Sequence, residues 1–322
     1  MKGFDPKYRD PAEFIIGVTK AIWEDRGVAT LHHHYAPSII VRSPASIVIG
    51  NGDVISATLA TLAEFPDRQL LAEDVIWCDD GGDGFLSSHR LICTATHLGD
   101  GAYGAGSGRS LRYRIIADCH AAANCIDDEW LVRDQGAILR GLGIDPQRFA
   151  ADQIAREGGP EACIRPFTPE QDRAGPYQGI GNASDWGARY GAILSRIMEA
   201  DLAVIPAEYD RAYKGAFPGG VEGVSHQAAD RFWIGLRSAF PSARFRIHHQ
   251  IGRDDPLWPP RAALRWSLTG RHDGWGMFGQ PTGAEVHVMG ISHAEFGPWG
   301  LRREWVAMDE TAIWKQIILA TG

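Results

Sequence analysis

The chain has 322 residues, of which 44% are hydrophobic and 22% charged, a composition typical of a globular protein. Its net charge is −8 and no cluster of lysine or arginine stands out, which argues against nucleic acid or a membrane surface as a partner. No apolar run approaches the ~20 residues of a membrane span, the N-terminus lacks the apolar stretch of a signal peptide, and none of the cysteines forms a C-x-x-C pair, so we expect a cytoplasmic protein with reduced thiols.

The first part of the chain carries signals for three helices. Asp10 suits a helix N-cap, and Phe14 and Val18 follow it at helical spacing. A short second helix is expected at residues 28–36 and a third at residues 53–65. These helices precede any clear strand, so the order of elements in this part is helices first.

After Pro66 the pattern changes to strands. Residues 70–78 and 85–97 flank the sequence DDGGDG, which is a strong hairpin signal. Two further strands are expected at residues 110–121 and 126–134. Helices followed by strands, rather than helices alternating with them, favour an α+β fold with a bent antiparallel sheet.

The second part of the chain repeats this order. Residues 151–183, rich in glycine, proline and charge, predict a linker with little structure of its own that could lie along the first domain. Helical stripes follow at residues 186–197 and after Ser225. Four strands are then expected at residues 243–251, 262–272, 284–296 and 301–309.

The two parts are related by a duplication. Identical residues recur 175 positions apart without a gap between residues 65 and 138, from Phe65-Pro66 and Phe240-Pro241 to Glu129-Trp130 and Glu304-Trp305. This spacing is far longer than the ~20–50 residues of a solenoid repeat, so the unit is a domain. We therefore expect a first domain at residues 1–150, a linker at 151–183 and a second domain at 184–322.

The glycine-rich segments THLGDGAYGAGSGRSLRYR and TGRHDGWGMFGQPTGAEVHVMGI, with the two Glu-Trp pairs, resemble the SnoaL-like polyketide cyclase family. That family belongs to the nuclear transport factor 2-like superfamily. The resemblance implies two tandem cone-shaped α+β domains, each with three helices on a bent antiparallel sheet. It also implies a cofactor-independent site for a small organic molecule, although family members range from cyclases, isomerases, dehydratases and hydrolases to non-catalytic binders.

One departure from the family concerns the acid/base residue. The resemblance implies an acidic residue after Gly290-Ile291, but Ser292 stands there, and its counterpart in the first repeat is Ala117. Asp118 and His293 are one place further on, at equivalent positions. Strand alternation puts Asp118 on one face with His120, and His293 on one face with Glu295, so each repeat offers a carboxylate–imidazole pair for proton transfer. The alternative is that this polar face is solvated or lies in a contact between the domains.

Several aromatic and histidine side chains are candidates for substrate binding. His97 and His272 precede the glycine-rich loops and would line a pocket mouth or make a turn hydrogen bond. Tyr103 and Phe278 lie in the loops themselves. The indoles of Trp130 and Trp305 would belong either to the site or to the core. Successive histidines at residues 32–34 point in different directions on a helix and predict no metal site.

The sequence thus predicts an acid/base enzyme without a cofactor or a metal, acting on a small apolar or cyclic organic molecule. The rival hypothesis is a non-catalytic small-molecule-binding or assembly protein, motivated by Ser292 and Ala117 at the family's acidic position. A third possibility is that one repeat is active and the other is a scaffold. The resemblance further implies that the two domains pack sheet to sheet as an intramolecular pseudo-dimer, with a homodimer as a further possibility.

Overall fold

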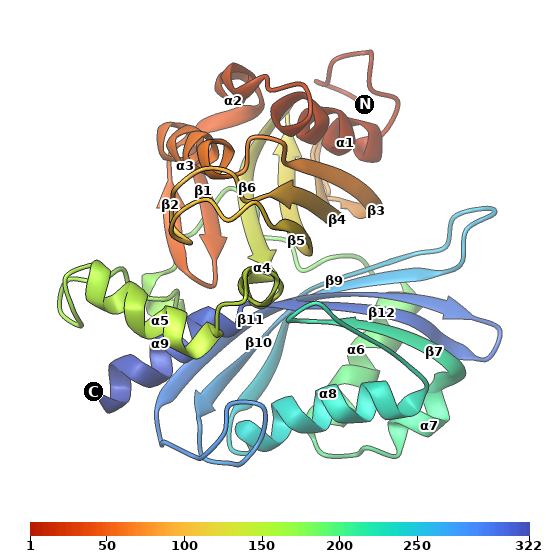
Figure 1. Ribbon diagram of the computed structural model, residues 1–322. Helices are drawn as coiled ribbons and strands as arrows, with labels where there is room; N and C mark the ends of the chain where they lie inside the picture. Colours follow the sequence, from red (N-terminus) through yellow and green to blue (C-terminus); the bar gives the residue numbers. More distant parts are fainter.

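A computed structural model describes all 322 residues as two units, each with helices on one face of a six-stranded sheet (Figure 1). The sheet orders are β2-β1-β6-β5-β4-β3 and β8-β7-β12-β11-β10-β9, so the two units have the same topology. None of the helices combines the length and apolar character needed to cross a membrane. The first unit consists of α1 (Pro11–Trp23), α2 (Leu31–His34), α3 (Asn51–Glu64), β1 (Tyr35–Ser43), β2 (Ser46–Ile49), β3 (Gln69–Asp79), β4 (Phe85–Thr96), β5 (Ser110–Ala122) and β6 (Cys125–Arg133).

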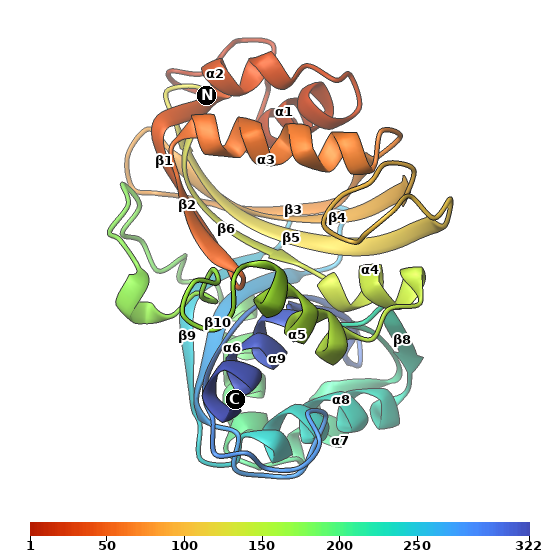
Figure 2. The same cartoon turned by 60° about the vertical axis from the view of Figure 1, so that its left-hand side comes forward.

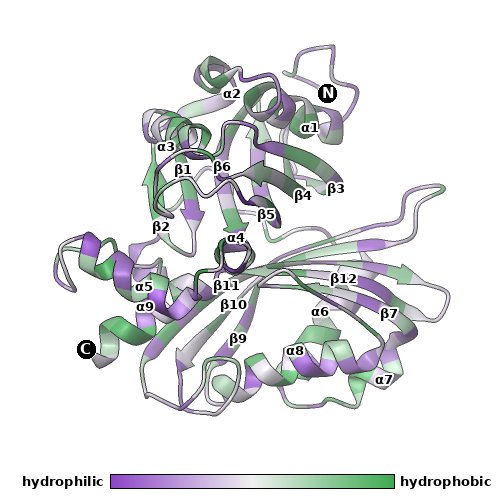
Figure 3. Ribbon diagram, in the orientation of Figure 1, coloured by the Kyte–Doolittle hydropathy of each residue, from purple (hydrophilic) through white to green (hydrophobic).

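The second unit repeats these elements in the same order and is followed by a C-terminal helix. Its helices α6 and α8 carry both hydrophobic and hydrophilic residues, as expected for helices that cover one face of a sheet (Figure 3). The predicted α+β class, with two tandem domains that have helices over a bent sheet, is confirmed. The elements are α6 (Asp185–Met198), α7 (Val204–Glu208), β7 (Tyr209–Phe217), β8 (Val221–Val224), α8 (His226–Ala239), β9 (Arg244–Arg253), β10 (Arg261–Arg271), β11 (Glu285–Gly297), β12 (Gly300–Met308) and α9 (Glu310–Thr321).

Two strands of each sheet were absent from the prediction. β1 pairs parallel with β6 and antiparallel with β2, so each sheet is mixed rather than antiparallel throughout. The helix expected at residues 28–36 shrinks to a short turn of helix before β1 begins at Tyr35. Pro37 lies inside β1, where the register between Tyr35 and Ile40 is irregular, and a proline within an apolar run weakens the strand signal in the sequence.

Three helices lie beside the sheets, between the two units (Figure 2). α4 (Gln135–Leu142) follows β6, α5 (Pro146–Arg156) continues from it, and both contact α9. Since α5 spans residue 150, where the first domain is predicted to end, the limits 1–150, 151–183 and 184–322 stay a prediction.

The segment between α5 and α6 contains one turn of 3-10 helix, η2 (Pro169–Gln171), and is otherwise irregular. Its last part, at residues 180–182, lies along the free edge of β9, where Gln250 donates to the Ile180 carbonyl and accepts from Asn182. The Asn182 side chain adds two bonds to the Gly252 backbone. The edge of the second sheet is therefore paired rather than exposed.

The two sheets face each other across the middle of the molecule, with the helices α1–α3 and α6–α8 on the outside (Figures 1 and 2). β3 contacts β9 and β10, and β5 and β6 both contact β11 and β12. Each sheet therefore has two buried faces, one against its own helices and one against the other domain.

Candidate functional site

Asp118 and His293 lie on the faces of their sheets that point away from the helices, where the two domains meet. Arg265 Nη1 donates to Asp118 Oδ2 at 3.0 Å, and Arg90 Nη1 donates to His293 Nδ1 at the same distance. Since the arginines are also 175 residues apart, the two contacts are pseudo-symmetric. Burial raises the pKa of Asp118 while Arg265 opposes that rise.

The environment of His293 fixes its protonation state. Burial and the neighbouring Arg90 hold the pKa of His293 well below its usual range, so the imidazole is neutral. Because a guanidinium only donates, Nδ1 must accept, and the proton sits on Nε2, which donates to Ser88 Oγ at 2.8 Å. A neutral, fully hydrogen-bonded imidazole inside an interface serves as a structural link between the domains.

Trp130 and Trp305 lie in the same interface and carry cation–π contacts. The Arg265 guanidinium lies 3.6 Å from the centre of the Trp130 ring, and the Arg90 guanidinium lies 3.6 Å from that of Trp305. Arg42 approaches Trp130 from another side, at 4.4 Å. Both indoles are partly buried between the sheets, on the face of β6 and β12 that points away from the helices.

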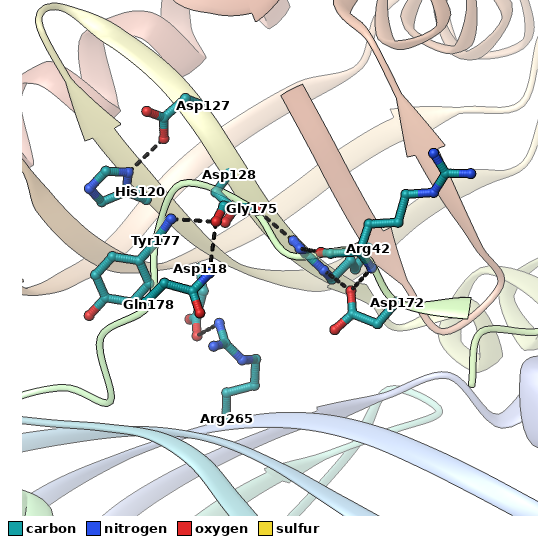
Figure 4. Close-up of polar contacts among 11 residues, drawn as sticks. Arg42, Asp118, His120, Asp127, Asp128, Asp172, Gly175, Tyr177, Gln178 and Arg265 are labelled. Carbon is teal, nitrogen blue, oxygen red and sulfur yellow. Dashed lines mark hydrogen bonds and ion pairs between the residues drawn. The ribbon is translucent and has the colours of Figure 1, made fainter. Parts of the chain in front are cut away.

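The predicted carboxylate–imidazole pairs do not meet in the structure. His120 bonds instead to Asp127 at 2.6 Å and Asp80 at 3.1 Å, and Figure 4 shows it apart from the Asp118–Arg265 pair. Burial alone would lower the pKa of His120, but its two carboxylate partners raise it. Glu295 lies 3.5 Å from Arg303 rather than beside His293.

Segment 172–178 fills part of the interface next to these residues (Figure 4). Tyr177 stacks on His120 with ring centres 4.9 Å apart, and its hydroxyl bonds to His249 Nε2 at 2.6 Å. The Tyr177 amide donates to Asp128, whose other oxygen accepts from buried Arg42 at 2.5 Å. The chain between the domains thus bonds to the same sheet face as the predicted pairs.

The remaining predicted binding residues lie at the glycine-rich loops. His97 Nδ1 bonds to Ser107 Oγ and His272 Nδ1 to Thr282 Oγ1, each at 3.0 Å, so both histidines make loop hydrogen bonds. The Tyr103 hydroxyl accepts from the Gln135 side chain at 2.6 Å, and its ring borders a surface hollow beside α5. Phe278 is buried in the core of the second domain and reaches a hollow beside α8.

A cavity of about 200 Å³ lies inside the first domain, between its helices and the inner face of its sheet. Sixteen of its 24 lining residues are hydrophobic. The ionisable side chains that line it are Tyr35, Arg68, His89, Cys119, Glu129 and Arg133. An apolar cavity with a few polar groups is the typical form of a small-molecule site. None of the four residues predicted to be catalytic lines it; their catalytic role stays a prediction.

Glu129 is the carboxylate of this cavity. It lies on β6 next to Trp130, and the alternation of the strand turns Glu129 inward while Trp130 points to the interface. Burial raises the pKa of Glu129 to about 7, and a hydrogen bond with Tyr35 partly opposes this rise. A carboxyl group with such a pKa exchanges protons near neutral pH.

His89 lines the same cavity from β4. Burial, assisted by the charge of Arg90, lowers the pKa of His89 to about 3, so its imidazole is neutral. Its Nε2 is buried and has no hydrogen-bond partner. The imidazole therefore brings an unsatisfied polar group to the wall of the cavity.

The second domain has no such opening at the equivalent place. Trp233 and Trp266 are fully buried inside it, and Glu304, the counterpart of Glu129, is enclosed by donors. The Tyr213 and Tyr190 hydroxyls bond to Glu304 at 2.6 and 2.9 Å, and Tyr209 and Trp233 add longer bonds of 3.3 Å. Burial raises the pKa of Glu304. Its carboxylate oxygens are occupied by hydrogen bonds from the surrounding core residues.

Glu129 is named in the sequence analysis only as part of a Glu-Trp motif, and Tyr35, Arg68, His89 and Arg133 are missing from it. A signal for three of them exists in the duplication. Counting 175 residues on from Arg68, His89 and Arg133 leads to Ala243, Leu264 and Met308. Polar residues whose counterparts in the other repeat are apolar mark the place where the two domains have diverged.

No protein-family model and no curated protein matches the chain. Solved structures of SnoaL-like polyketide cyclases are similar to part of it. IdmH from Streptomyces antibioticus, a proposed polyketide cyclase, is 20% identical with a TM-score of 0.37, covering 42% of this chain and 100% of its own. A SnoaL-like polyketide cyclase from Agrobacterium tumefaciens is 18% identical with a TM-score of 0.33, covering 42% and 98%. AclR from Streptomyces galilaeus, a proposed hydroxylase, is 21% identical with a TM-score of 0.31, covering 40% and 82%.

Proposed function

We propose that the protein is a cofactor-independent acid/base enzyme for a small apolar or cyclic organic molecule, with its site in the cavity of the first domain. The observation that carries the proposal is a carboxyl group, Glu129, whose pKa burial raises to about 7 inside an apolar cavity. Taking a proton from a substrate carbon and returning it at another atom would serve a cyclisation, an isomerisation or a dehydration, and taking it from a water bound beside the substrate would serve a ring hydrolysis.

In this proposal Glu129 takes the proton from the substrate carbon. Tyr35, which bonds to Glu129, holds the carboxylate toward the cavity and stabilises its charged form. The neutral imidazole of His89 binds a polar group of the substrate, and the apolar walls exclude bulk water. Glu129 then returns the proton at another atom.

The second domain acts as the scaffold in this proposal. Its interior is occupied by aromatic side chains around Glu304, and its sheet supports that of the first domain. The predicted catalytic residues Asp118, His120, His293 and Glu295 form the rival site, which would lie between the domains. With five free cysteines and a net charge of −8, we further infer that the protein acts in the cytoplasm without a nucleic acid or membrane partner.

The test uses a carbon acid that fits the cavity, 2-tetralone, in deuterated buffer, with exchange of its α-protons followed by NMR. The wild type should accelerate the exchange, and Glu129→Gln should lower that acceleration by about 100-fold or more, because general-base catalysis supplies about that much. Glu304→Gln makes the same change in the closed domain and should leave the exchange intact. Exchange that survives Glu129→Gln but is lost in Asp118→Asn would place the chemistry between the domains instead.

A non-catalytic binding protein is the second candidate function. Ser292, at the family's acidic position, accepts a hydrogen bond from Trp266 Nε1 at 3.0 Å and is a core residue. Binding of 2-tetralone without any accelerated exchange in the wild type would favour this candidate.

A further inference from the structure

The cavity of the first domain contains two arginines without a carboxylate partner. Arg68 is 1% exposed, its Nε bonds to the Cys93 sulfur at 3.3 Å, and its guanidinium lies 4.2 Å from the centre of the Trp23 ring. Its Nη1 is buried without a hydrogen-bond partner. A buried guanidinium whose neighbours are a thiol and aromatic rings, without a carboxylate, has a charge left to neutralise.

Arg133, which is partly buried, also lacks a carboxylate partner. It lines the cavity from β6, its Nε is buried without a partner, and no aspartate or glutamate forms an ion pair with it. The Arg68 guanidinium lies 5.9 Å from the centre of the Tyr113 ring and bonds to Cys93, which pairs with Tyr113 in the sheet. Arg133 pairs with Ile115, two residues further along the same strand, β5. The two arginines therefore share one end of the cavity.

Glu129 lies at a distance from that end. Glu129 and Arg133 are four residues apart on the inner face of β6, which is about 13 Å at ~3.3 Å per residue. The groups that act on Glu129 are Tyr35 and the apolar surroundings, with no arginine among them. The cavity thus has a proton-exchanging end and a cationic end, joined by apolar wall such as Leu131.

The second domain provides an internal comparison. The counterparts of Arg68 and Arg133 are Ala243 and Met308, both of which are buried in its closed interior. The duplicated fold is therefore complete with two neutral residues at these positions. Because burying unpaired charges destabilises a protein, the arginines of the first domain are explained by a ligand rather than by the fold.

We propose that the molecule bound in this cavity carries a carboxylate, which lies between Arg68 and Arg133 while its reacting carbon lies at Glu129. This inference rests on the proposed site and names its substrate class: an elongated, apolar carboxylic acid. Both guanidiniums line the cavity without a carboxylate partner in the protein, and the N–H groups of a guanidinium match the two oxygens of a planar carboxylate.

Binding of three naphthalene probes to the full-length protein tests the inference. 2-Naphthoate, the neutral 2-naphthamide and 2-naphthyl phosphate share one ring system, and titration calorimetry gives their dissociation constants. The wild type should bind 2-naphthoate about tenfold or more tightly than 2-naphthamide, the value of one charged hydrogen bond. Arg68→Met and Arg133→Met, which keep the side-chain length, should each remove most of that preference.

The control is Arg112→Met, which removes an exposed arginine from the same sheet and should keep the preference. Equal binding of 2-naphthoate and 2-naphthamide to the wild type would overturn the inference, and so would a preference that survives both cavity variants. Tighter binding of 2-naphthyl phosphate than of 2-naphthoate would replace the carboxylate by a phosphate ester. If either variant unfolds, Arg68→Gln or Arg133→Gln replaces it.

The same titrations separate this inference from the proposed function. Glu129→Gln removes the proton-transferring group but leaves both arginines, so it should retain the preference for 2-naphthoate while losing the exchange of 2-tetralone. Loss of the preference in Glu129→Gln would contradict the separate cationic end. If the wild type prefers 2-naphthoate but does not accelerate the exchange of 2-tetralone, the carboxylate ligand is supported and the catalytic role of Glu129 is not.

Discussion

Two glutamates at equivalent positions show how far surroundings decide what a residue does. Glu129 and Glu304 occupy the same place in the two repeats, on the inner face of the last strand. Glu304 is surrounded by three tyrosine hydroxyls and an indole N–H, whereas Glu129 has Tyr35 and an open cavity. The same carboxyl group is therefore a core residue in one domain and available for chemistry in the other.

The raised pKa of Glu129 makes the stability of the protein depend on pH. Because the folded pKa, about 7, lies above the usual value of 4.5, the folded state binds its proton more tightly than the unfolded chain does. The contribution of Glu129 is fully present below about pH 4.5 and is lost as the pH rises through about 7. Glu129→Gln, which stays neutral, should gain about 3 kcal/mol relative to the wild type between pH 5 and pH 8.

Urea denaturation of both proteins at the two pH values measures this difference, and Glu161→Gln, at an exposed position, serves as the control. A stability difference between wild type and Glu129→Gln that stays constant with pH would mean that Glu129 titrates as it does in water. That result would also remove the main support for its role as a base.

At the scale of elements, the free edge of the second sheet depends on a glycine. Gly181 has a φ of +110° and lies against β9, so a Cβ built on it would meet the Gln250 carbonyl oxygen at 1.6 Å. Gly181→Ala should therefore lower the free energy of unfolding by well over the ~1–2 kcal/mol of a positive φ alone. Chemical denaturation measures it, and Gly104→Ala is the matched control, since Gly104 has a φ of +100° but open space around it. Equal losses in the two variants would show that the contact with β9 is unimportant.

The sequence predicted which residues share a face of each strand. It did not predict which of the two faces turns to the helices and which to the other domain. It predicted correctly that Asp118 and His120 share a face, because strand alternation is local. Apolar and polar residues usually reveal which face is buried, but here both faces of each sheet are covered, one by helices and one by the other domain. Burial therefore could not be read from hydropathy. The sequence assigns Trp130 to either the site or the core, and it does not single out the neighbouring Glu129, which faces the cavity.

Strands β1 and β2 were not predicted from the sequence, for a different reason. Pro37 interrupts β1, and the partner that stabilises β1 is β6, some 90 residues away in the sequence. β1 and β2 do form a hairpin, but its turn residues Pro44-Ala45 lack the glycine or asparagine of a strong hairpin signal, and the parallel pairing with β6 leaves no local signal. The cavity residue Tyr35 belongs to this strand, so the site could not be completed from the sequence either.

At the scale of the whole molecule, the contact between the domains has two pseudo-symmetric halves of unequal charge. Arg265 meets the carboxylate of Asp118, and Arg90 meets the neutral imidazole of His293. Removing Arg265 leaves a buried carboxylate unpaired, so Arg265→Met should destabilise the protein by about 3–5 kcal/mol. Adding Asp118→Asn to that variant should restore much of the loss, because no buried charge is left without a partner.

Arg90→Met provides the comparison, since it uncovers the neutral His293 and removes a stacking contact with Trp305. It also removes an ion pair with Glu73, but that carboxylate keeps Arg114 as a second partner. Its loss should be smaller, about 1–3 kcal/mol. Thermal and chemical denaturation of the wild type and the three variants checks the order of stability. If Arg265→Met and its double variant with Asp118→Asn are equally unstable, the Asp118–Arg265 pair contributes only through packing.

Because the second domain is on the same chain, its support of the first domain does not depend on protein concentration. A hollow domain with buried charges is at a disadvantage in stability, and in a dimer of separate chains its support would be lost as the concentration falls. Here the support is on the same chain, tethered by the segment that also bonds to both sheets. Docking is intramolecular, so its strength is set by an effective concentration rather than by the amount of protein present. Such a chain keeps its cavity formed at any expression level, and a cell can use it in trace amounts.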